Sequence, residues 1–392
     1  MAGAVAPGFE RVEDAFLTAQ AADSGGAQLC VMRRGEVVVD LWTGRDPAAN
    51  RDWGPDTLTV IMSCTKAVVA LMVHRLAEQG RLDIEAPVAR YWPQFAAAGK
   101  AELTIAHLLT HSAGLPGFAP EAGIDTEAML DWERSTAALA AQAPLWPPGS
   151  AYAYHAITYG YLLGEVIRRV TGKLPGQLLA EEIAGPLGLD LWIGLPAAEQ
   201  ARVAEHFRPA PAGGEAGWIA LFKAGGADVE SPLVKTFVAM FVVTDQLIDA
   251  MNTPRFRAAE IPAGNGIGNA RSVARLYAAA IGEVDGFRII SPHTLAKATA
   301  PRTDGLTGPG PLARQAPQGT VQRFGLGFEL PRNAMPMMSP ASFGHPGAGG
   351  RVAYGDPQTG IAAAYVCNNM LWDGLTADPR WAWNDALRAC VQ

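Results

Sequence analysis

At residues 61–66 the chain reads Ile-Met-Ser-Cys-Thr-Lys, and an apolar run from Ala67 to Leu76 follows. A serine and a lysine three residues apart at the start of a helix lie on one face, about one turn apart, so the amine of Lys66 can reach the hydroxyl of Ser63. Serine is a weak nucleophile unless a neighbour takes its proton, and a lysine does so only where its surroundings lower its pKa. The apolar flanks allow this. The stretch therefore predicts a nucleophile, Ser63, beside its base, Lys66.

The spacing of Ser63 and Lys66 is not specific by itself. A Ser-x-x-Lys sequence also arises by chance in a chain of this length, and a serine at the start of a helix is more often a simple cap. The catalytic interpretation therefore depends on support from the rest of the chain.

The composition is that of a folded protein larger than one ordinary domain. The 392 residues suggest two domains, or one large domain with an insertion. Hydrophobic residues make up 49% and charged residues 18%, so a substantial core is expected. A net charge of −7 without a basic cluster argues against a nucleic-acid partner. The cysteines lie far apart without C-x-x-C spacing and are expected to be free thiols: Cys30, Cys64, Cys367 and Cys390.

Neither an export signal nor a membrane span is expected. Glu10 and Arg11 fall where a secretory signal needs an uninterrupted apolar segment. The most apolar long window, residues 233–251, contains Lys235, Asp245 and Asp249, and therefore indicates a buried helix. The resulting prediction is a cytoplasmic protein without a membrane partner.

Strands are predicted near both ends of the chain, with helices between them. Residues 28–32 and 36–42 indicate a hairpin, because Arg33-Arg34-Gly35 separates two β-rich runs. Further strands are expected at 325–330, 351–354 and 361–366. The expected helices are 7–22, the helix from Ser63 that ends at Gly80, 104–111, 126–142, 158–170, 175–183, 233–250, 270–281 and 379–390, and 209–226 is expected to be a surface loop. The long helical block between β-rich flanks is typical of an insertion.

Two further motifs invite a ligand-binding interpretation and receive little weight. His107 and His111 have the i, i+4 spacing of two metal ligands, but the glutamate of H-E-x-x-H and a third ligand are missing. Histidines that pin a helix C-terminus through backbone hydrogen bonds are the favoured interpretation. The glycine run at 264–268 lacks the G-x-G-x-x-G spacing of a nucleotide site, and no strand clearly precedes it.

Two other segments combine turn residues with candidate site residues. Pro147-Pro148-Gly149-Ser150 leads into Tyr152 and Tyr154, which packing alone would place in the core or at its rim. The segment Phe-Gly-His-Pro-Gly-Ala-Gly-Gly at 343–350 is a tight loop in its simplest interpretation, and in its functional one a backbone that comes close to a ligand.

The order of Ser63 and Lys66, then Tyr154, then His345-Pro346-Gly347 resembles that of the serine β-lactamases and penicillin-binding proteins. The closer resemblance is to class C β-lactamases and family VIII carboxylesterases, in which a tyrosine motif stands between the other two. Matching phrases also occur at 110–115, 148–150 and 161–172. The resemblance covers roughly residues 28–366 and is specific as to fold and nucleophile.

This resemblance implies an α+β fold of the β-lactamase type. Residues 1–85 and 260–392 would form a domain with an antiparallel sheet flanked by helices, and residues 86–259 a mostly helical inserted domain, with the active site in the cleft between them. The predicted order of strands and helices agrees with this arrangement. No metal or organic cofactor is implied.

The resemblance also implies a serine ester hydrolase. Ser63 would attack the ester carbonyl, and Lys66 with Tyr154 would act as a coupled base. The N–H groups of Ser63 and Ala348 would hold the oxyanion, with His345 and Gly347 in the substrate-binding segment. Small, uncharged esters with short acyl chains are the expected substrates.

Two departures from the lactamase pattern favour ester chemistry. Ala156 stands where Tyr-x-Asn has the asparagine that helps to hold a lactam amide, and His345 stands where K-T-G has its lysine. A histidine near its ordinary pKa is mostly neutral at pH 7 and gives a lactam carboxylate no fixed charge. The alternatives are a β-lactamase or D-Ala peptidase, an acyltransferase that uses the same acyl-enzyme, and a non-catalytic scaffold that keeps the fold.

Overall fold

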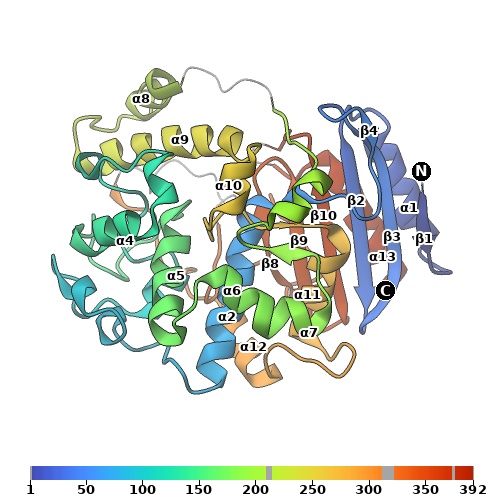
Figure 1. Cartoon of the computed structure of the whole chain (residues 1–392). Coiled ribbons are helices and arrows are strands. Elements are labelled where there is room, and N and C mark those ends of the chain that lie inside the picture. The colour runs from blue at the N-terminus through green and yellow to red at the C-terminus, as the bar shows by residue number, and fades with distance from the viewer. Residues whose placement is uncertain (1, 209–213, 311–321, 373–375, 392) are drawn as a thin grey trace.

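The predicted hairpin is confirmed as part of a large antiparallel sheet in the computed structural model, which describes residues 2–208, 214–310, 322–372 and 376–391 (Figure 1). The strands lie in the order β1-β3-β2-β10-β9-β8, and β4 pairs with the end of β3. Both ends of the chain therefore build one sheet. Its strands are β1 Ala2–Val5, β2 Gly26–Arg33, β3 Glu36–Asp46, β4 Arg51–Asp52, β8 Phe343–Gly347, β9 Arg351–Asp356 and β10 Ile361–Cys367.

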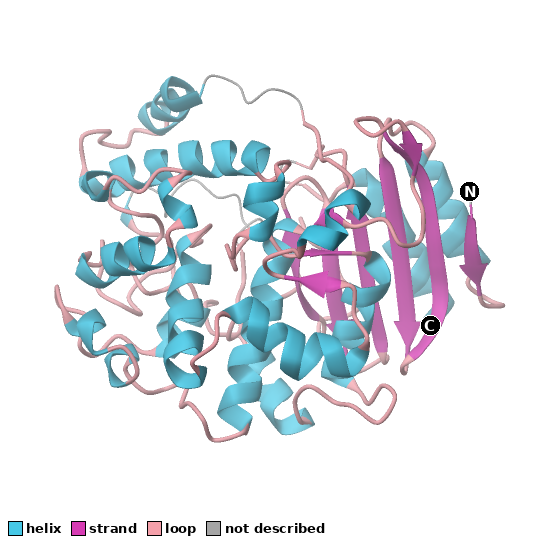
Figure 2. Cartoon of the chain, in the orientation of Figure 1, coloured by secondary structure: helices cyan, strands magenta, loops and turns pink. Residues whose placement is uncertain are grey.

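The helices fall into two groups (Figure 2). Three of them pack on the sheet: α1 Glu10–Gln20, α11 Ala270–Ile281 and α13 Ala382–Val391. Between the sheet and the helical part runs α2 Thr65–Glu78, which contacts both β8 and α5. The others are α3 Ile105–Leu109, α4 Trp132–Ala141, α5 Thr158–Thr171, α6 Pro175–Leu179, which continues through a π-helical turn into α7 Gly185–Leu187, α8 Gly214–Ala224, α9 Pro232–Ala250, α10 Pro254–Ala258 and α12 Pro292–Thr299.

Alternating side chains of β2 enter two different hydrophobic cores, because successive residues of a strand point to opposite faces of the sheet. Leu29 and Val31 join a cluster shared with α1 and α13. Cys30 and Met32 join a larger cluster shared with α2, α5 and α11. The sheet is therefore covered on both faces, and α2 is buried in the larger core.

A second, small sheet holds the segment that leads to the nucleophile. It has the order β5-β7-β6, with β5 Thr59–Val60, β7 Ile267–Gly268 and β6 Leu191–Trp192. Because β6 lies in the middle of the chain, strands are not confined to the two ends as predicted. The pairing of β5 with β7 brings residues 264–268 beside the start of α2.

Two segments, one predicted as a loop and one as a strand, have a different secondary structure in the molecule. Residues 214–224 of the predicted loop form α8, whose Phe222 packs with Phe237 of α9; residues 209–213 lie outside the described ones. The segment 325–330 is not a strand, because the chain turns sharply there with Gly327 at φ 89°, and Glu329 forms only isolated bridges.

Two other predictions are also wrong in part, one about where a helix begins and one about a segment expected to be a loop. The helix predicted at 126–142 begins only at Trp132, since the Asp131 side chain accepts a hydrogen bond from the N–H of Arg134 and caps it there. The glycine-rich segment at 343–347 is a strand, β8. Gly344 is needed in it, because a Cβ would lie 2.1 Å from the carbonyl oxygen of Ala353 on β9. No helix in the described part of the chain has both the length and the apolarity to cross a bilayer.

Candidate active site

Ser63 lies in a single 3₁₀ turn, Met62–Cys64, that leads directly into α2. Met62 has a φ of 51°, a conformation that costs a non-glycine residue about 1–3 kcal/mol. The hydroxyl of Thr65 donates to the Met62 carbonyl at 2.6 Å and holds the turn in place. Ser63 therefore stands at the N-terminal end of α2, where it lines a cleft.

Lys66 is completely buried on α2, and its amine contacts three oxygen atoms. Nζ lies 3.1 Å from Oγ of Ser63 and donates to the carbonyls of Ala156, at 2.8 Å, and Ala263, at 2.7 Å. A neutral amine has two N–H groups and one lone pair. With both N–H groups on the carbonyls, the lone pair faces the hydroxyl of Ser63 and can accept its proton.

The surroundings of Lys66 favour this neutral form. Burial lowers its pKa well below the ordinary value of 10.5, and the smaller, opposing influence comes from the neighbouring Cys64 thiol. More of Lys66 is therefore free amine at neutral pH than in an exposed lysine. The predicted nucleophile and base are brought within hydrogen-bond distance in a setting that suits proton transfer.

Tyr154 stands beside both groups. Nζ of Lys66 lies 4.7 Å from the centre of its half-buried ring. Burial raises the pKa of Tyr154 well above its ordinary value, and hydrogen bonding to Ser63 lowers it to a smaller extent. The two shifts together favour a neutral amine and a neutral phenol at rest. Ser63 thus touches two groups that can carry its proton.

Two buried histidines fix the segment that holds Tyr154. His111 accepts a hydrogen bond at Nδ1 from the N–H of His155 at 3.1 Å, and its ring packs 4.9 Å from that of Tyr154. His155 donates from Nδ1 to the Ala153 carbonyl at 2.6 Å and accepts at Nε2 from the N–H of Leu115 at 3.1 Å. These bonds leave the tyrosine little freedom to move away from Lys66.

The histidine pair does not pin the C-terminus of α3 as predicted. His107 belongs to its N-terminus, where Nδ1 accepts from the N–H of Thr104 at 3.1 Å in a capping box. His111 lies beyond the helix, with a φ of 57°. Across the described ranges, no three metal-ligating side chains come together.

His345 lies in the middle of β8 and lines the cleft with 1% of its surface exposed. Nδ1 donates to the carbonyl of Pro346 at 2.6 Å, which leaves Nε2 as an acceptor without a partner among the described groups. Burial and the nearby Lys66 lower the pKa of His345 to about 3. His345 is therefore neutral at pH 7, as expected from the sequence, but the reason is its burial beside Lys66 and not an ordinary pKa.

Ala348 and Gly347 have different positions at the end of β8. Ala348 lines the cleft, and within the described residues neither its N–H nor that of Ser63 donates to another protein group. Gly347 packs instead against the turn before Ser63, since a Cβ there would lie 2.5 Å from the carbonyl oxygen of Ile61. Gly347 lets β8 approach that turn, and Ala348 presents a free N–H at the cleft that Ser63 also lines.

The cleft has a volume of about 580 Å³, within the range of about 300–1,000 Å³ usual for small-molecule sites. Its reactive side holds Ser63, Tyr154, His345 and Ala348. Much of the remaining wall is apolar, and its largest contribution comes from α9: Phe237, Met240, Phe241, Leu247 and Ile248. The wall also includes Gln322 and Arg332, and the guanidinium of Arg332 is paired with the buried carboxylate of Glu329 at 2.6 Å. With this charge paired, the cleft suits an uncharged organic molecule.

Comparison with known proteins identifies the family. A family model described as Beta-lactamase matches residues 9–387. The chain belongs to the beta-lactamase family. It is 36% identical over 382 residues to Esterase/beta-lactamase LipL of Mycobacterium tuberculosis, an alignment that covers 94% of this chain and 83% of that protein.

Two solved structures from this comparison confirm the predicted fold class and the resemblance. A family VIII carboxylesterase has a TM-score of 0.83 at 35% identity and covers 99% of both chains. EstA from Arthrobacter nitroguajacolicus has a TM-score of 0.84 at 30% identity and covers 100% of this chain and 99% of its own.

One part of this beta-lactamase-family cleft is not predicted by the sequence. The Ala263 carbonyl that binds Lys66 precedes the glycine run at 264–268, whose Gly266 N–H donates to Oγ1 of Thr65 at 2.9 Å. A Cβ on Gly266 would lie 2.5 Å from that oxygen. The glycine run is therefore a signal of close backbone approach, to the helix that holds Lys66 and not to a nucleotide.

Proposed function

We propose that the chain is a serine carboxylic ester hydrolase that works through an acyl-enzyme on Ser63. The observation that carries this proposal is the contact of Lys66 with Ser63. The buried amine of Lys66 donates to two backbone carbonyls and directs its lone pair at the hydroxyl of Ser63, with Nζ 3.1 Å from Oγ. Such a base can take the proton that a serine must lose to act as a nucleophile.

The reaction would run in two halves. As Oγ of Ser63 attacks the ester carbonyl, its proton passes to Lys66, and the N–H groups of Ser63 and Ala348 stabilise the oxyanion. The proton then moves, by way of the Tyr154 hydroxyl, to the departing alcohol, and the C–O bond of the ester breaks. Water next attacks the carbonyl of the acyl-enzyme and gives one proton to the same pair of groups. The bond between the acyl carbon and Oγ of Ser63 then breaks, the proton returns to Oγ, and the acid is released.

The cleft and the relatives together support esters as substrates. The wall is mostly apolar, and His345 is neutral, so the site offers no fixed charge at the position where lactamases have a lysine. The related proteins are named an esterase/beta-lactamase, a family VIII carboxylesterase and EstA. Small, uncharged esters are the proposed substrate class.

The test is hydrolysis of p-nitrophenyl acetate together with labelling by a serine-directed phosphonate. Mass spectrometry of the wild type should place the phosphonate on Ser63. Ser63→Ala should lose both the label and at least about 99.9% of the turnover, because loss of a covalent nucleophile normally costs more than that. The matched control is Ser24→Ala, an exposed serine that does not line the cleft, which should keep both. A label on another residue, or activity retained in Ser63→Ala, would refute the proposal.

A further inference from the structure

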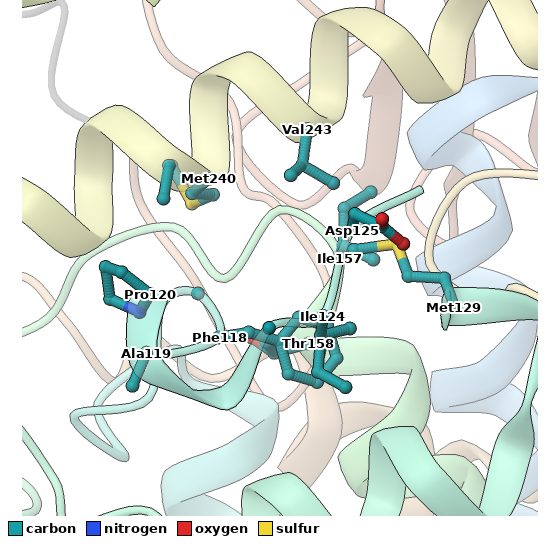
Figure 3. A pocket seen from close by; sticks show the side chains of 13 residues that line it. Phe118, Ala119, Pro120, Ile124, Asp125, Met129, Ile157, Thr158, Met240 and Val243 are labelled. Carbon is teal, nitrogen blue, oxygen red and sulfur yellow. The ribbon is translucent and has the colours of Figure 1, made fainter. Parts of the chain in front are cut away.

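We propose that a second, apolar cavity beside the cleft binds the hydrocarbon chain of an ester substrate. Figure 3 shows this cavity, with Met240 and Val243 pointing into it from α9 and Phe118 and Ile124 on the opposite side. Its volume is about 300 Å³. The inference rests on the proposed ester hydrolysis and extends its substrates beyond short acyl chains.

The cavity adjoins the catalytic cleft. Ile157 and Met240 line both spaces, so they form the boundary between them. Ile157 directly follows Ala156, whose carbonyl holds the amine of Lys66. An ester whose carbonyl lies at Ser63 therefore has its reacting group next to this boundary, and a chain attached to it can pass between Ile157 and Met240.

The lining of the cavity selects for hydrocarbon. The lining has two side chains that carry a hydroxyl or a carboxylate. Oγ1 of Thr158 is buried and donates to the Leu115 carbonyl at 2.6 Å, whereas Asp125 is exposed to solvent, and its Oδ1 accepts from the N–H of Ala128 at 2.8 Å. None of the described lining side chains has a buried polar atom without a partner. Against the apolar side chains of the lining, away from Asp125, a polar group would lose its hydrogen bonds to water without replacement, whereas methylene groups lose nothing.

The size of the cavity sets the expected effect. It lies at the lower end of the range for small-molecule sites, about 300–1,000 Å³, so it holds an alkyl chain better than a bulky ring system. Each methylene transferred from water to such a site can raise kcat/KM by up to about fourfold. We therefore expect kcat/KM to rise by at least about tenfold between butyrate and octanoate esters.

The inference is tested by filling the cavity from α9. Val243→Phe, with Ala239→Leu as a milder second variant, adds volume at positions that line the cavity but not the cleft. Against p-nitrophenyl acetate both should stay within about twofold of wild type, while the gain between butyrate and octanoate should disappear. The matched control is Val242→Phe on the same helix, which adds equal volume to the cluster shared with α8 and should keep the gain.

A second substrate series identifies which side of the ester enters the cavity. Ethyl, butyl and octyl acetates vary the alcohol, whereas the p-nitrophenyl esters vary the acid. If kcat/KM rises with chain length among the acetates and the filling variants abolish this rise, the alcohol chain lies in the cavity. If they abolish the rise among the p-nitrophenyl esters, the acyl chain lies there.

Two failures can be told apart. If wild type hydrolyses the acetate but gains nothing with chain length in either series, or if the filling variants leave the gain unchanged, the inference is wrong and the proposed function stands. If wild type neither hydrolyses the acetate nor takes a phosphonate label, the proposed function is wrong and the inference fails with it.

Discussion

At the scale of single residues, the proton of Ser63 can be taken by a pair of groups, since Lys66 and Tyr154 both contact it. If they act as one unit, Lys66→Ala or Tyr154→Phe alone should each lower kcat by about 10²–10⁴-fold, and the double variant should be little slower than the slower single. Steady-state kinetics of the three variants measures this. The matched control is Tyr152→Phe, because Tyr152 does not itself line the cleft and its hydroxyl bonds only to the backbone carbonyl of Gln322. Additive losses in the double variant would mean that the two groups act independently.

The same pair determines how the rate depends on pH. Lys66 accepts a proton only as the free amine, so the rate should rise with pH through an apparent pKa that belongs to the coupled pair. Because burial lowers the pKa of Lys66, this rise should come well below the ordinary value of 10.5. A pH–kcat/KM profile of the wild type checks it, and a rise near 10.5 would contradict the role given to Lys66.

His345 is where this chain departs most from the lactamase pattern. Its buried, neutral ring gives no charge to an anionic substrate. His345→Lys should raise the ratio of kcat/KM for a cephalosporin to that for a neutral short-chain ester by roughly tenfold, the effect of a charge pair in a partly desolvated cleft. His345→Gln, which adds no charge, should leave the ratio unchanged. If wild type already cleaves cephalosporins as fast as esters, the charge argument is wrong and a β-lactamase becomes the better assignment.

At the scale of elements, Glu165 joins α4 to α5. Its fully buried carboxylate accepts hydrogen bonds from Arg168, Arg169 and the indole of Trp132 at 2.6–2.8 Å. Glu165→Gln keeps the shape but removes the charge from these partners. We expect it to lower the free energy of unfolding by about 1–3 kcal/mol at pH 7, measured by urea denaturation. The control Glu133→Gln, an exposed neighbour of Arg168, should cost less than about 0.5 kcal/mol.

This loss should depend on pH. Burial would raise the pKa of Glu165, but its hydrogen bonds to Arg168, Arg169 and Trp132 outweigh burial and lower the pKa below the ordinary 4.5. A lowered pKa stabilises the folded state above the unfolded value and stops doing so as the pH falls through the folded value. The difference between wild type and Glu165→Gln should thus be full at pH 7 and shrink below about pH 4.5. A difference that grows on acidification would contradict this account.

The sequence predicts most of the long elements, because their apolar periodicity is local. α5 and α11 match their predicted segments almost residue for residue. The sequence does not indicate α8, because its flanks are rich in alanine, proline and glycine, and its position is fixed by the packing of Phe222 on α9. The glycines of β8 suggest a loop that approaches a strand, whereas Gly344 is there to let two strands pair closely.

The site is predictable where side chains carry the signal. The sequence indicates Ser63, Lys66 and Tyr154 as a group, and the structure brings them together. The carbonyls of Ala156 and Ala263, which orient the amine, could not be predicted, because backbone groups leave no mark on residue type and these two residues are distant in sequence. Nor does any local sequence pattern indicate that α9 lines one side of the cleft.

At the scale of the whole molecule, we propose that residues 1–85 with 260–392 and the helical insertion 86–259 fold as one cooperative unit. The larger hydrophobic cluster contains both Met32 of β2 and Leu163 of α5, so it crosses the proposed boundary. The smaller cluster, under α1 and α13, shares β2 and β10 with it through alternate side chains. Because the two clusters share these strands, neither cluster can lose its packing without exposing side chains of the other.

This proposal predicts how damage in one core spreads to the other. Leu163→Ala in α5 and Leu387→Ala in α13 each empty a fully buried site and should each lower the free energy of unfolding by about 2–5 kcal/mol. If the molecule opens as one unit, each variant should speed hydrogen exchange of the slowest amides in both α5 and α13 by the same factor. Exchange followed by mass spectrometry measures this, with Leu371→Ala, a leucine that is 54% exposed, as the control that should change neither. If Leu387→Ala instead loosens only α1 and α13, the two cores unfold separately, and cleft geometry would then depend on the larger core alone.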